Sequence, residues 1–512
     1  MSGQLFDHTT VTADIERSCD VAIVGSGAGG AVLAAGLCAL GLDVVLLEAG
    51  SHWPRQRLKL EESQAFPGMY QERGSRATDD LGITILQGRT VGGSTTVNWT
   101  TCYRTPERIL NHWAAHHGLE ALSGDELTAH FEAIEQRLSI TPWPESAANP
   151  NNRVIFDGCK ALGWEAKPLT RNIKGCANSG YCGLGCPVDG KQAMGVTTLQ
   201  DALRDGLTLF SEAQVTHVDH ANGRVVTVHA QVHAPNDPEP RGPRITIRPK
   251  VFVASGGAIN TPGLLLRSGI DLDGRVGRRT FIHPVVAAIG VYEERIEPYW
   301  GAPQSAGSHE HIDRGPGKMG YFIEAAPLQP MIAAVALTNF GAAFQHDISK
   351  LPHISGLIAL TVDGLLPGEE GGTVRLRPDG RPTLSYPMHP ALIESFTAGT
   401  RSLAQVHLAA GAARVQSTHL DPVVLTSDAD LPRLAERPYG AHEHALFTAH
   451  QMGGCSMGTG EGAVVDPQHR LRGFTNAFVV DGSVLPTALG VNPSQTIYGL
   501  AHRAVPIVAE AV

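Results

Sequence analysis

Three thiols lie close together in the segment GCANSGYCGLGCPVDGK, residues 175–191. Cys176, Cys182 and Cys186 fall within eleven residues of a chain that has eight cysteines in all. Thiolates bind zinc and iron–sulfur clusters, and three of them suffice for a three-iron cluster. Zinc usually takes four ligands, with closer spacing in the first pair. Three interpretations therefore stay open at this point: a zinc site, reduced thiols that pack a tight glycine turn, and an iron–sulfur cluster.

A second chemical pattern lies near the N-terminus, where Gly25, Gly27 and Gly30 form G-x-G-x-x-G. Gly25 permits a tight turn, Gly27 lets the backbone approach a pyrophosphate, and Gly30 lets a helix pack on a strand. The helix that follows offers its N-terminal N–H groups and positive dipole end to the phosphates. Glu48, 18 residues beyond Gly30, stands where a carboxylate can hold a ribose hydroxyl and would repel a 2′-phosphate.

The elements around these glycines support a dinucleotide site. The stretch CDVAIVGSGAGGAVLAAGLCALGLDVVLLEAG, residues 19–50, predicts a buried strand, a glycine turn, a helix and a second strand that ends at Glu48. A glycine-rich turn without a ligand is the alternative. The chain shows no second nucleotide pattern, since GLGCPVDG, residues 183–190, lacks the third glycine and follows no apolar strand. One dinucleotide site in so long a chain favours bound FAD, with electrons supplied by a substrate.

Length and composition set the wider frame. A chain of 512 residues with 42% hydrophobic and 18% charged residues predicts a globular protein with two or more cores. The formal net charge of −10, without a long basic run, makes nucleic acid an unsuitable partner. We find no secretory signal and no transmembrane segment, and therefore expect a cytoplasmic protein, with membrane association left open. Disulfides are then a poor explanation for clustered cysteines.

Other segments predict further sheet structure. Residues 213–256 have the pattern of a meander of short strands, interrupted by the Pro-rich connection APNDPEPRGP, which we interpret as a surface loop. Between residues 286 and 439, GTVRLRPDGRPTLSYP predicts two strands around an Asp-Gly turn, in a separate sheet. The segment ILQGRTVGGSTTVNW, residues 85–99, places small hydroxyl residues after a Gly-Gly turn and suits a backbone that lies against a flat ring.

Several blocks resemble the glucose–methanol–choline (GMC) oxidoreductases, in order and over nearly the whole chain. They are the N-terminal glycine pattern, GGSTTVN (92–98), ASGGAINTPGLLLRSGI (254–270), HQMGGCSMG (450–458), VVDGSVLP (479–486) and GVNPSQTIYGLAHRA (490–504). Within this family, HQMGGCSMG, LPTALGVNPSQT and the cysteine loop are most similar to long-chain alcohol oxidases. The GVNP step is shared with cholesterol oxidases.

The resemblance implies roles for individual residues. His450 matches the histidine that faces the flavin and the substrate hydroxyl, and Asn492 matches the second catalytic position. The FAD-binding positions that it implies, besides the glycine pattern and Glu48, are Gly93, Ser94, Asn98, Val215 and Asp481. A neutral imidazole can take a proton near neutral pH, and an amide can donate a hydrogen bond to the alcohol oxygen without ionising. The alternatives are a buried core histidine at 450 and a simple turn residue at 492.

The resemblance also implies an α/β fold, in which a discontinuous, Rossmann-like FAD domain alternates with an α+β substrate domain. We place the FAD-binding domain at 1–105, 200–285 and 440–512, and the substrate-binding domain at 106–199 and 286–439. The second domain is expected to be a sheet with helices over its back.

We therefore expect FAD-dependent oxidation of a hydrophobic primary alcohol to the aldehyde, with oxygen or an electron-carrier protein as acceptor. A flavin-containing lyase without net redox chemistry and a non-catalytic flavin-binding protein are the alternatives. The cysteine loop is also similar to that of the sugar-dehydrogenase members, where a [3Fe–4S] cluster takes electrons from FAD. Long-chain alcohol oxidases have a further cysteine where this chain has Ser179. Cys176, Cys182 and Cys186 are thus candidate cluster ligands.

Overall fold

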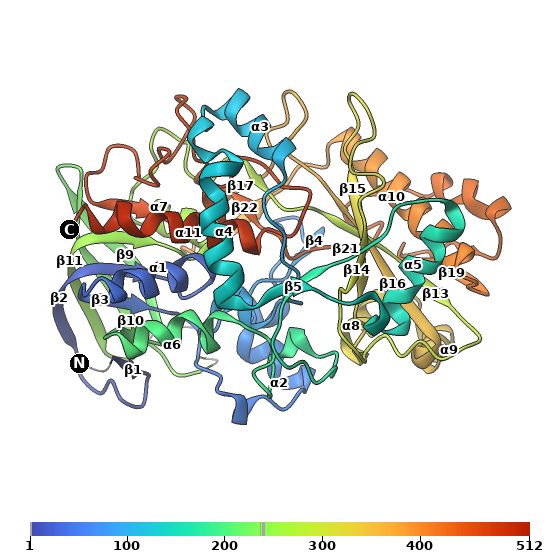
Figure 1. Ribbon diagram of the computed structural model, residues 1–512, viewed down its shortest axis with the longest axis horizontal. Coiled ribbons are helices and arrows are strands. Elements are labelled where there is room, and N and C mark those ends of the chain that lie inside the picture. Colours follow the sequence, from blue (N-terminus) through green and yellow to red (C-terminus); the bar gives the residue numbers. More distant parts are fainter. Residues whose placement is uncertain (1–2, 236, 238–240) are drawn as a thin grey trace.

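The computed structural model describes residues 3–235, 237 and 241–512, and it contains two large sheets that lie side by side. Figure 1 shows the first sheet on the left, near both chain ends, and the second sheet on the right. Part of the Pro-rich connection, at residues 236 and 238–240, lies outside the described residues. The two-sheet α/β architecture confirms the fold class predicted above.

The first sheet contains the predicted strand–helix–strand unit. Its strands follow the order β1-β8-β3-β2-β11-β10-β9, and β23 also pairs with β11. From β1 to β11 the neighbours are parallel, as is β23, whereas β10 and β9 extend the sheet as an antiparallel meander. The bounds are β1 Gln4–Phe6, β2 Ile15–Val24, β3 Val44–Leu47, β8 Thr208–Phe210, β9 Ala213–Ala221, β10 Arg224–Val232, β11 Arg244–Ala254 and β23 Ala477–Val479.

Four helices stack beside this sheet. Helix α1 (Ala28–Ala39) packs against α6 (Thr198–Arg204) and α11 (Ser494–Ala509), and α11 packs against α4 (Gly124–Leu138). All four residues of β3 are buried, which explains why its sequence, VVLL, is continuously apolar instead of alternating. Helix α7 (Gly257–Arg267) packs against β9.

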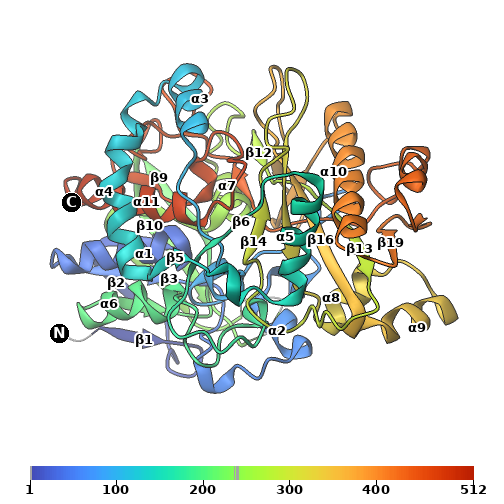
Figure 2. The same ribbon diagram turned by 45° about the vertical axis from the view of Figure 1, so that its right-hand side comes forward.

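The second sheet is antiparallel along its main path, β20-β19-β13-β16-β15-β14-β6. Helices α5 (Pro150–Leu162) and α10 (Pro390–Ala409) pack against its strands and against each other, as predicted, and Figure 2 shows them beside β13 and β16. The bounds are β6 Lys167–Pro168, β13 Val285–Val291, β14 Ala306–Ser308, β15 Tyr321–Ala326, β16 Ile354–Thr361, β19 Arg414–Ser417 and β20 Val424–Leu425.

Smaller elements complete the described part of the chain. The predicted Asp-Gly hairpin is β17 (Thr373–Leu376) paired with β18 (Pro382–Ser385) in a sheet of its own. The other elements are α2 Glu62–Met69, α3 Glu107–His117, α8 Pro330–Ala336, α9 Gly341–Ser349, β4 Ile83–Ile85, β5 Ile140–Pro142, β7 Thr170–Asn172, β12 Thr280–Phe281, β21 Leu446–Thr448 and β22 Met452–Gly453. Across the described residues, we find no helix whose length and apolar character would let it cross a membrane.

The two halves of the molecule are connected by shared strands. Strand β21 pairs with β13 and with β4, so two short strands from the predicted FAD segments belong to the second sheet. Conversely, α4 lies in a predicted substrate segment and packs on α11 of the first half. The domain limits given above stay a prediction, and the strands β4 and β21 mark where the two halves meet.

Candidate active site

A cleft of about 1030 Å³ opens where the two halves meet. Ten of the residues predicted from the sequence line it: Gly25, Gly27, Glu48, Gly93, Ser94, Asn98, Val215, His450, Asp481 and Asn492. Segments from the beginning, the middle and the end of the chain therefore converge on one site. Gly30 lies off the wall of the cleft, and the three clustered cysteines line a separate small cavity.

The glycine turn has the shape that a dinucleotide site needs. Gly25 has a φ of +104°, and a Cβ there would lie 2.3 Å from the carbonyl oxygen of Ser255. A Cβ at Gly30 would lie 2.0 Å from the carbonyl oxygen of Gly25, so only glycine lets α1 approach β2 this closely. At Gly27, by contrast, a Cβ would meet only the Cα of Gly93, at 3.9 Å. Gly27 thus faces open space in the cleft, where a pyrophosphate fits.

Glu48 lies at the end of β3, buried, with its carboxylate held in a fixed orientation. Its Oε2 accepts hydrogen bonds from the backbone N–H (3.0 Å) and the hydroxyl (2.7 Å) of Ser26, and Oε1 accepts from the N–H of Gly50 (2.7 Å). Burial raises the pKa of this carboxyl, and these hydrogen bonds oppose the shift. A carboxylate fixed in this way at the cleft wall can accept further hydrogen bonds from ribose hydroxyls.

A second carboxylate, Asp481, also lines the cleft, and its Cα would lie 3.2 Å from a Cβ at Gly29 in the glycine turn. Its Oδ2 accepts from the hydroxyl of Thr261 (2.6 Å) and the N–H of Gly257 (2.7 Å), and Oδ1 accepts from the N–H (2.8 Å) and hydroxyl (2.5 Å) of Ser483. Burial raises the pKa of Asp481 in turn. With Glu48, it gives the cleft two positioned acceptors for the hydroxyl groups of a sugar-like chain.

His450 and Asn492 meet in the cleft, although they are 42 residues apart in the sequence. The amide Nδ2 of Asn492 lies 3.2 Å from Nε2 of His450. On the other side of the ring, Nδ1 of His450 lies 3.1 Å from Nδ1 of His283. Burial lowers the pKa of His450 to about 4, so the imidazole is neutral near neutral pH. A neutral imidazole beside an amide can bind a hydroxyl group and exchange a proton with it.

His283, which the sequence did not single out, is built into this site by an unusual backbone. Its φ is +43°, in the left-handed region that few non-glycine residues adopt. The buried carboxylate of Asp363 stabilises this conformation, because it accepts from the N–H groups of Ile282 (2.9 Å) and His283 (3.0 Å). The hydroxyl of Tyr386 also donates to Asp363 (2.7 Å). His283 is therefore held in place against the ring of His450.

Glu324 is the second residue that the sequence did not single out. It is 1% exposed and lies on β15, and its Oε2 accepts from Nε2 of Gln304 (2.6 Å) and lies 3.4 Å from the amide Nδ2 of Asn492. Burial raises the pKa of Glu324 to about 8, so this carboxyl is protonated at neutral pH. A signal was present, since an acid within the buried strand YFIEAA is costly unless it is paired or functional.

The cysteine loop lies against the wall of the cleft. Cys176, Cys182 and Cys186 line a cavity of about 20 Å³, and Thr100 borders both this cavity and the cleft. The three cysteine sulfurs do not all lie within 4.8 Å of one another; among the described residues, a group of three potential ligands this close together occurs elsewhere. The sulfurs are therefore too far apart for a preformed zinc site. A cluster with several irons has a wider ligand spacing and is not subject to this limit.

Two buried cations accompany the cysteines. The guanidinium of Arg171 is fully buried, and its Nη2 lies 4.0 Å from Sγ of Cys182. Its Nε and Nη1 have no hydrogen-bond partner among the described residues. The ammonium group of Lys191 donates to the carbonyl oxygens of Thr96 (2.5 Å), Asn98 (3.0 Å) and Cys182 (2.7 Å), which connects the loop to the cleft wall. Burial lowers the pKa of Lys191 to about 8. Burial raises the pKa of the Cys182 thiol, and the charges of Arg171 and Lys191 oppose this shift.

Comparison with known proteins places the chain among related sequences. Two family models, both described as GMC oxidoreductase, match residues 66–285 and 367–501. An uncharacterized GMC-type oxidoreductase of Mycobacterium tuberculosis is 31% identical over 489 residues, which cover 94% of this chain and 74% of that protein. A long-chain-alcohol oxidase of Arabidopsis thaliana is 30% identical over 507 residues, with 94% of this chain and 67% of that protein covered.

Solved structures with similar folds are more distant in sequence. Pyridoxine 4-oxidase from Mesorbium loti superposes with a TM-score of 0.72 at 19% identity and covers 95% of this chain and 98% of its own. A formate oxidase of Aspergillus oryzae superposes with a TM-score of 0.70 at 16% identity, with 97% and 99% covered. At these identities the likeness concerns the fold.

Proposed function

Because the chain belongs to the GMC oxidoreductase family, we propose that it binds FAD and oxidises a hydrophobic primary alcohol to the aldehyde. The convergence of the glycine turn, Glu48, Asp481, His450 and Asn492 on one cleft is the observation that carries this proposal. When bound, FAD supplies the acceptor for the hydride that leaves the alcohol carbon. The protein has to bind the cofactor, orient the alcohol and take up its hydroxyl proton.

The cleft fits FAD in three respects. The open space at Gly27 lies at the start of α1, and no acidic residue lies in the first turn of that helix, so its N-terminus suits a pyrophosphate. Glu48 and Asp481 supply acceptors for ribose and ribityl hydroxyls. Gly93 lies against Gly27, where a Cβ would approach the Cα of Gly27 to 2.7 Å, so only a glycine lets these two segments of the cleft wall come this close.

We assign proton uptake to His450 and substrate positioning to Asn492. Nε2 of His450 and the amide of Asn492 lie close enough to bind one hydroxyl oxygen between them. Glu324 acts as a positioning residue, since it contacts the amide of Asn492 and also binds Gln304, whose Oε1 accepts from the hydroxyl of Thr101 (3.0 Å). Protonated Glu324 adds no charge to the cleft, and a neutral site suits an uncharged alcohol.

The presence of long-chain-alcohol oxidases among the relatives supports a long, apolar alcohol as the substrate of this chain and oxygen as its electron acceptor. The experiment that tests the proposal is an anaerobic screen of alcohols in which bleaching of the flavin is measured. A lyase of the same family would leave the flavin oxidised with every substrate, and a non-catalytic flavin protein would not respond to any alcohol. Purified protein without flavin would contradict the proposal at its first step.

The [3Fe–4S] cluster in the cysteine loop stays a prediction. The buried cations Arg171 and Lys191 and the shared wall at Thr100 support a negatively charged group beside the cleft. A cluster would make the protein a dehydrogenase that passes single electrons to a carrier, whereas bare thiols leave oxygen as the acceptor. Anaerobic purification followed by iron and sulfide analysis separates these two cases.

A further inference from the structure

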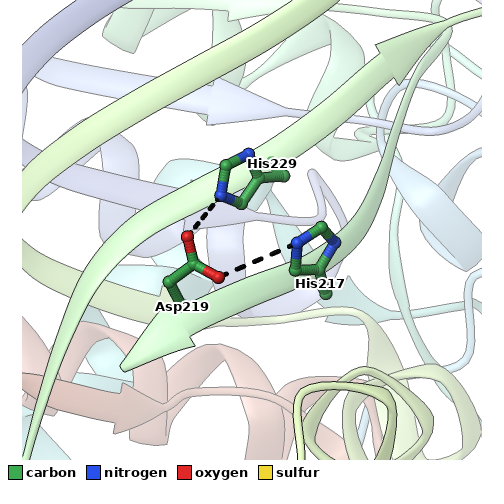
Figure 3. A group of neighbouring side chains, drawn as sticks. All are labelled: His217, Asp219 and His229. Carbon is green, nitrogen blue, oxygen red and sulfur yellow. Dashed lines mark hydrogen bonds and ion pairs between the residues drawn. The ribbon is translucent and has the colours of Figure 1, made fainter. Parts of the chain in front are cut away.

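Two histidines and an aspartate meet on the outer face of the β9–β10 ribbon, outside the cleft (Figure 3). We propose that His217, Asp219 and His229 form a binding site for a divalent transition-metal ion of the Zn²⁺ class. The ligand atoms of the three side chains all lie within 4.8 Å of one another. This site is independent of the oxidoreductase function proposed above.

The register of the two strands explains why these side chains share a face. His217 of β9 lies directly opposite His229 of β10, and Asp219 lies two residues further along β9. Residues that are opposite each other or two apart on a strand project from the same face of a sheet. Strand β9 also contains a β-bulge at Thr216. The register passes from the pair His217–His229 directly to the pair Val215–Ala230, so Thr216 has no partner in β10.

This bulge turns His217 toward solvent. In a regular strand without the bulge, His217 would project from the same face as Val215, which is buried. With it, His217 is 47% exposed, and Val218 takes the buried position. The bulge therefore places His217, and with it Asp219, on the outer face, whereas regular alternation from Val215 would have turned both toward the core.

The separations are close to those of a metal site. Nε2 of His229 lies 2.7 Å from Oδ2 of Asp219, and Nε2 of His217 lies 3.9 Å from Oδ1 of the same carboxylate. The two rings are stacked, with centroids 4.5 Å apart and an angle of 12° between their planes. Ligands that are about 2.0–2.2 Å from one zinc ion lie roughly 3–3.5 Å apart. Small side-chain rotations at this exposed position bring the three atoms to that spacing.

The hydrogen bonds around Thr216 leave one ligand nitrogen without a proton. The hydroxyl of Thr216 donates to the carbonyl oxygen of His229 (3.2 Å), so it must accept at Oγ1 from Nδ1–H of His217 (3.0 Å). A neutral His217 then has a lone pair at Nε2 and presents it to the carboxylate of Asp219. Two acceptors that face each other are stabilised by a cation between them. The contact at Nδ1 also fixes the ring, as outer hydrogen bonds do for metal-bound histidines.

The ligand set determines which ion fits. Two imidazoles with one carboxylate suit Zn²⁺, Cu²⁺ or Ni²⁺ better than Ca²⁺ or Mg²⁺, which prefer oxygen ligands. Water completes the coordination, because the site is open to solvent. Binding replaces the proton on Nε2 of His229, which is released to solvent.

The place of the site in the fold indicates what binding would do. Val215 and Thr216 of the same strand line the cleft, and the carbonyl oxygen of Thr216 accepts from Nε of Arg267 (2.9 Å) on α7. An ion between β9 and β10 would therefore stabilise the strand that forms one wall of the cleft. We expect it to raise thermal stability without a direct part in alcohol oxidation.

The test is calorimetric titration of the flavin-loaded, chelator-treated protein with Zn²⁺ at pH 7.5. Wild type is compared with His217→Gln, His229→Gln and a matched control, His220→Gln, which removes another histidine of β9 that lies outside the ligand set. We expect each ligand variant to weaken one Zn²⁺ equivalent by at least about 10-fold, and the control to retain it. Any binding by the cysteines is common to all four proteins and cancels in the comparison.

Thermal unfolding supplies a second readout on the same proteins. Zn²⁺ should raise the melting temperature of wild type and of His220→Gln more than that of His229→Gln, because any contribution from the cysteines is the same in these proteins. Superimposable titrations for wild type and both ligand variants would overturn the proposal. So would an increase in melting temperature that is as large in His217→Gln and His229→Gln as in wild type.

Discussion

Replacement of the buried acid beside Asn492, Glu324→Gln, tests how the proposed site controls charge. Burial raises the pKa of Glu324 from an ordinary 4.5 to about 8. Between these pH values the folded protein keeps the proton and the unfolded chain releases it, so stability falls as pH rises from 4.5 to 8. A shift of about 3.5 units at about 1.4 kcal/mol per unit corresponds to about 5 kcal/mol. Glutamine resembles the protonated acid and has no such dependence.

The assay is denaturant unfolding of wild type and Glu324→Gln at a series of pH values from 5 to 8.5. We expect similar free energies of unfolding near pH 5, and an advantage of the variant that grows by up to about 5 kcal/mol toward pH 8.5. Glu145→Gln, at an exposed position, is the matched control and should show no growing advantage. A difference between wild type and Glu324→Gln that does not change with pH would refute the reasoning, because it would mean that Glu324 is ionised throughout.

The same variant examines the assignment of the base. If His450, with a pKa of about 4, takes the proton, flavin reduction should rise with pH through about 4 and then stay level. Glu324→Gln should keep that plateau, since the neutral amide preserves the contact to Asn492. A wild-type rate that rises through about pH 8, and a variant that lacks this rise, would instead assign proton uptake to Glu324.

His450→Ala should slow flavin reduction by alcohol about 10²-fold or more in anaerobic stopped-flow experiments, with FAD content unchanged; a wild-type rate would mean that another group takes the proton. Asn492→Ala should slow the same step less steeply. Gly27→Ala should abolish FAD binding while the apoprotein stays folded by circular dichroism, because the added Cβ enters open cleft space. Gly30→Ala should instead lower the melting temperature, because its Cβ would lie 2.0 Å from a carbonyl oxygen. If a cluster forms, anaerobically purified wild type should contain about three irons per chain, and Cys182→Ser should lose them with FAD retained.

Local patterns in the sequence were sufficient for much of the fold. The strand–helix–strand unit, the meander and the Asp-Gly hairpin were each predicted from neighbouring residues, and the structure has them as β2–α1–β3, β9–β11 and β17–β18. The pairing of β4 with β21 could not be predicted in this way. These strands have three residues each and lie more than 350 positions apart, so only the packed tertiary structure brings them together.

The residues of the candidate site also fall into two groups, those found in sequence motifs and those that only the tertiary structure brings into the site. Residues inside recognisable motifs, such as Gly27, Asp481 and His450, line the cleft, and their roles there stay a prediction. His283 and Glu324 lie in no recognisable motif. The contact of Glu324 to Asn492 depends on strand pairing within the second sheet, and the contact of His283 to His450 depends on the hydrogen bond from the His283 N–H to Asp363. A residue that acts only by contact with another residue leaves little trace in the chain. Glu324 left such a trace, because an acid within the buried apolar strand YFIEAA is costly unless it is paired.

The contact between His283 and His450 raises a question about proton placement that a single variant can answer. The N–H of Gly490 donates to Nε2 of His283 (3.1 Å), so a neutral His283 carries its proton on Nδ1 and donates it to Nδ1 of His450. With its proton on Nε2, neutral His450 could hold the alcohol oxygen as a donor but could not accept its proton. Nδ2 of Asn492, however, can only donate and lies 3.2 Å from Nε2 of His450, so this contact requires the other tautomer, with the proton on Nδ1. Base catalysis by His450 needs that second tautomer, which the contact to Asn492 favours and the contact to His283 opposes.

His283→Asn removes this constraint, because asparagine tolerates a positive φ and is too short to reach His450. Nδ1 of His450 can then carry the proton, and Nε2 is free to accept one. If His450 is the base, the rate of flavin reduction per bound FAD should stay within about 10-fold of wild type. This rate should also rise with pH through about 4, as in wild type. A loss as large as that in His450→Ala, with FAD still bound, would show that the proton on His283 takes part in the reaction. The two histidines would then have to be treated as one catalytic unit.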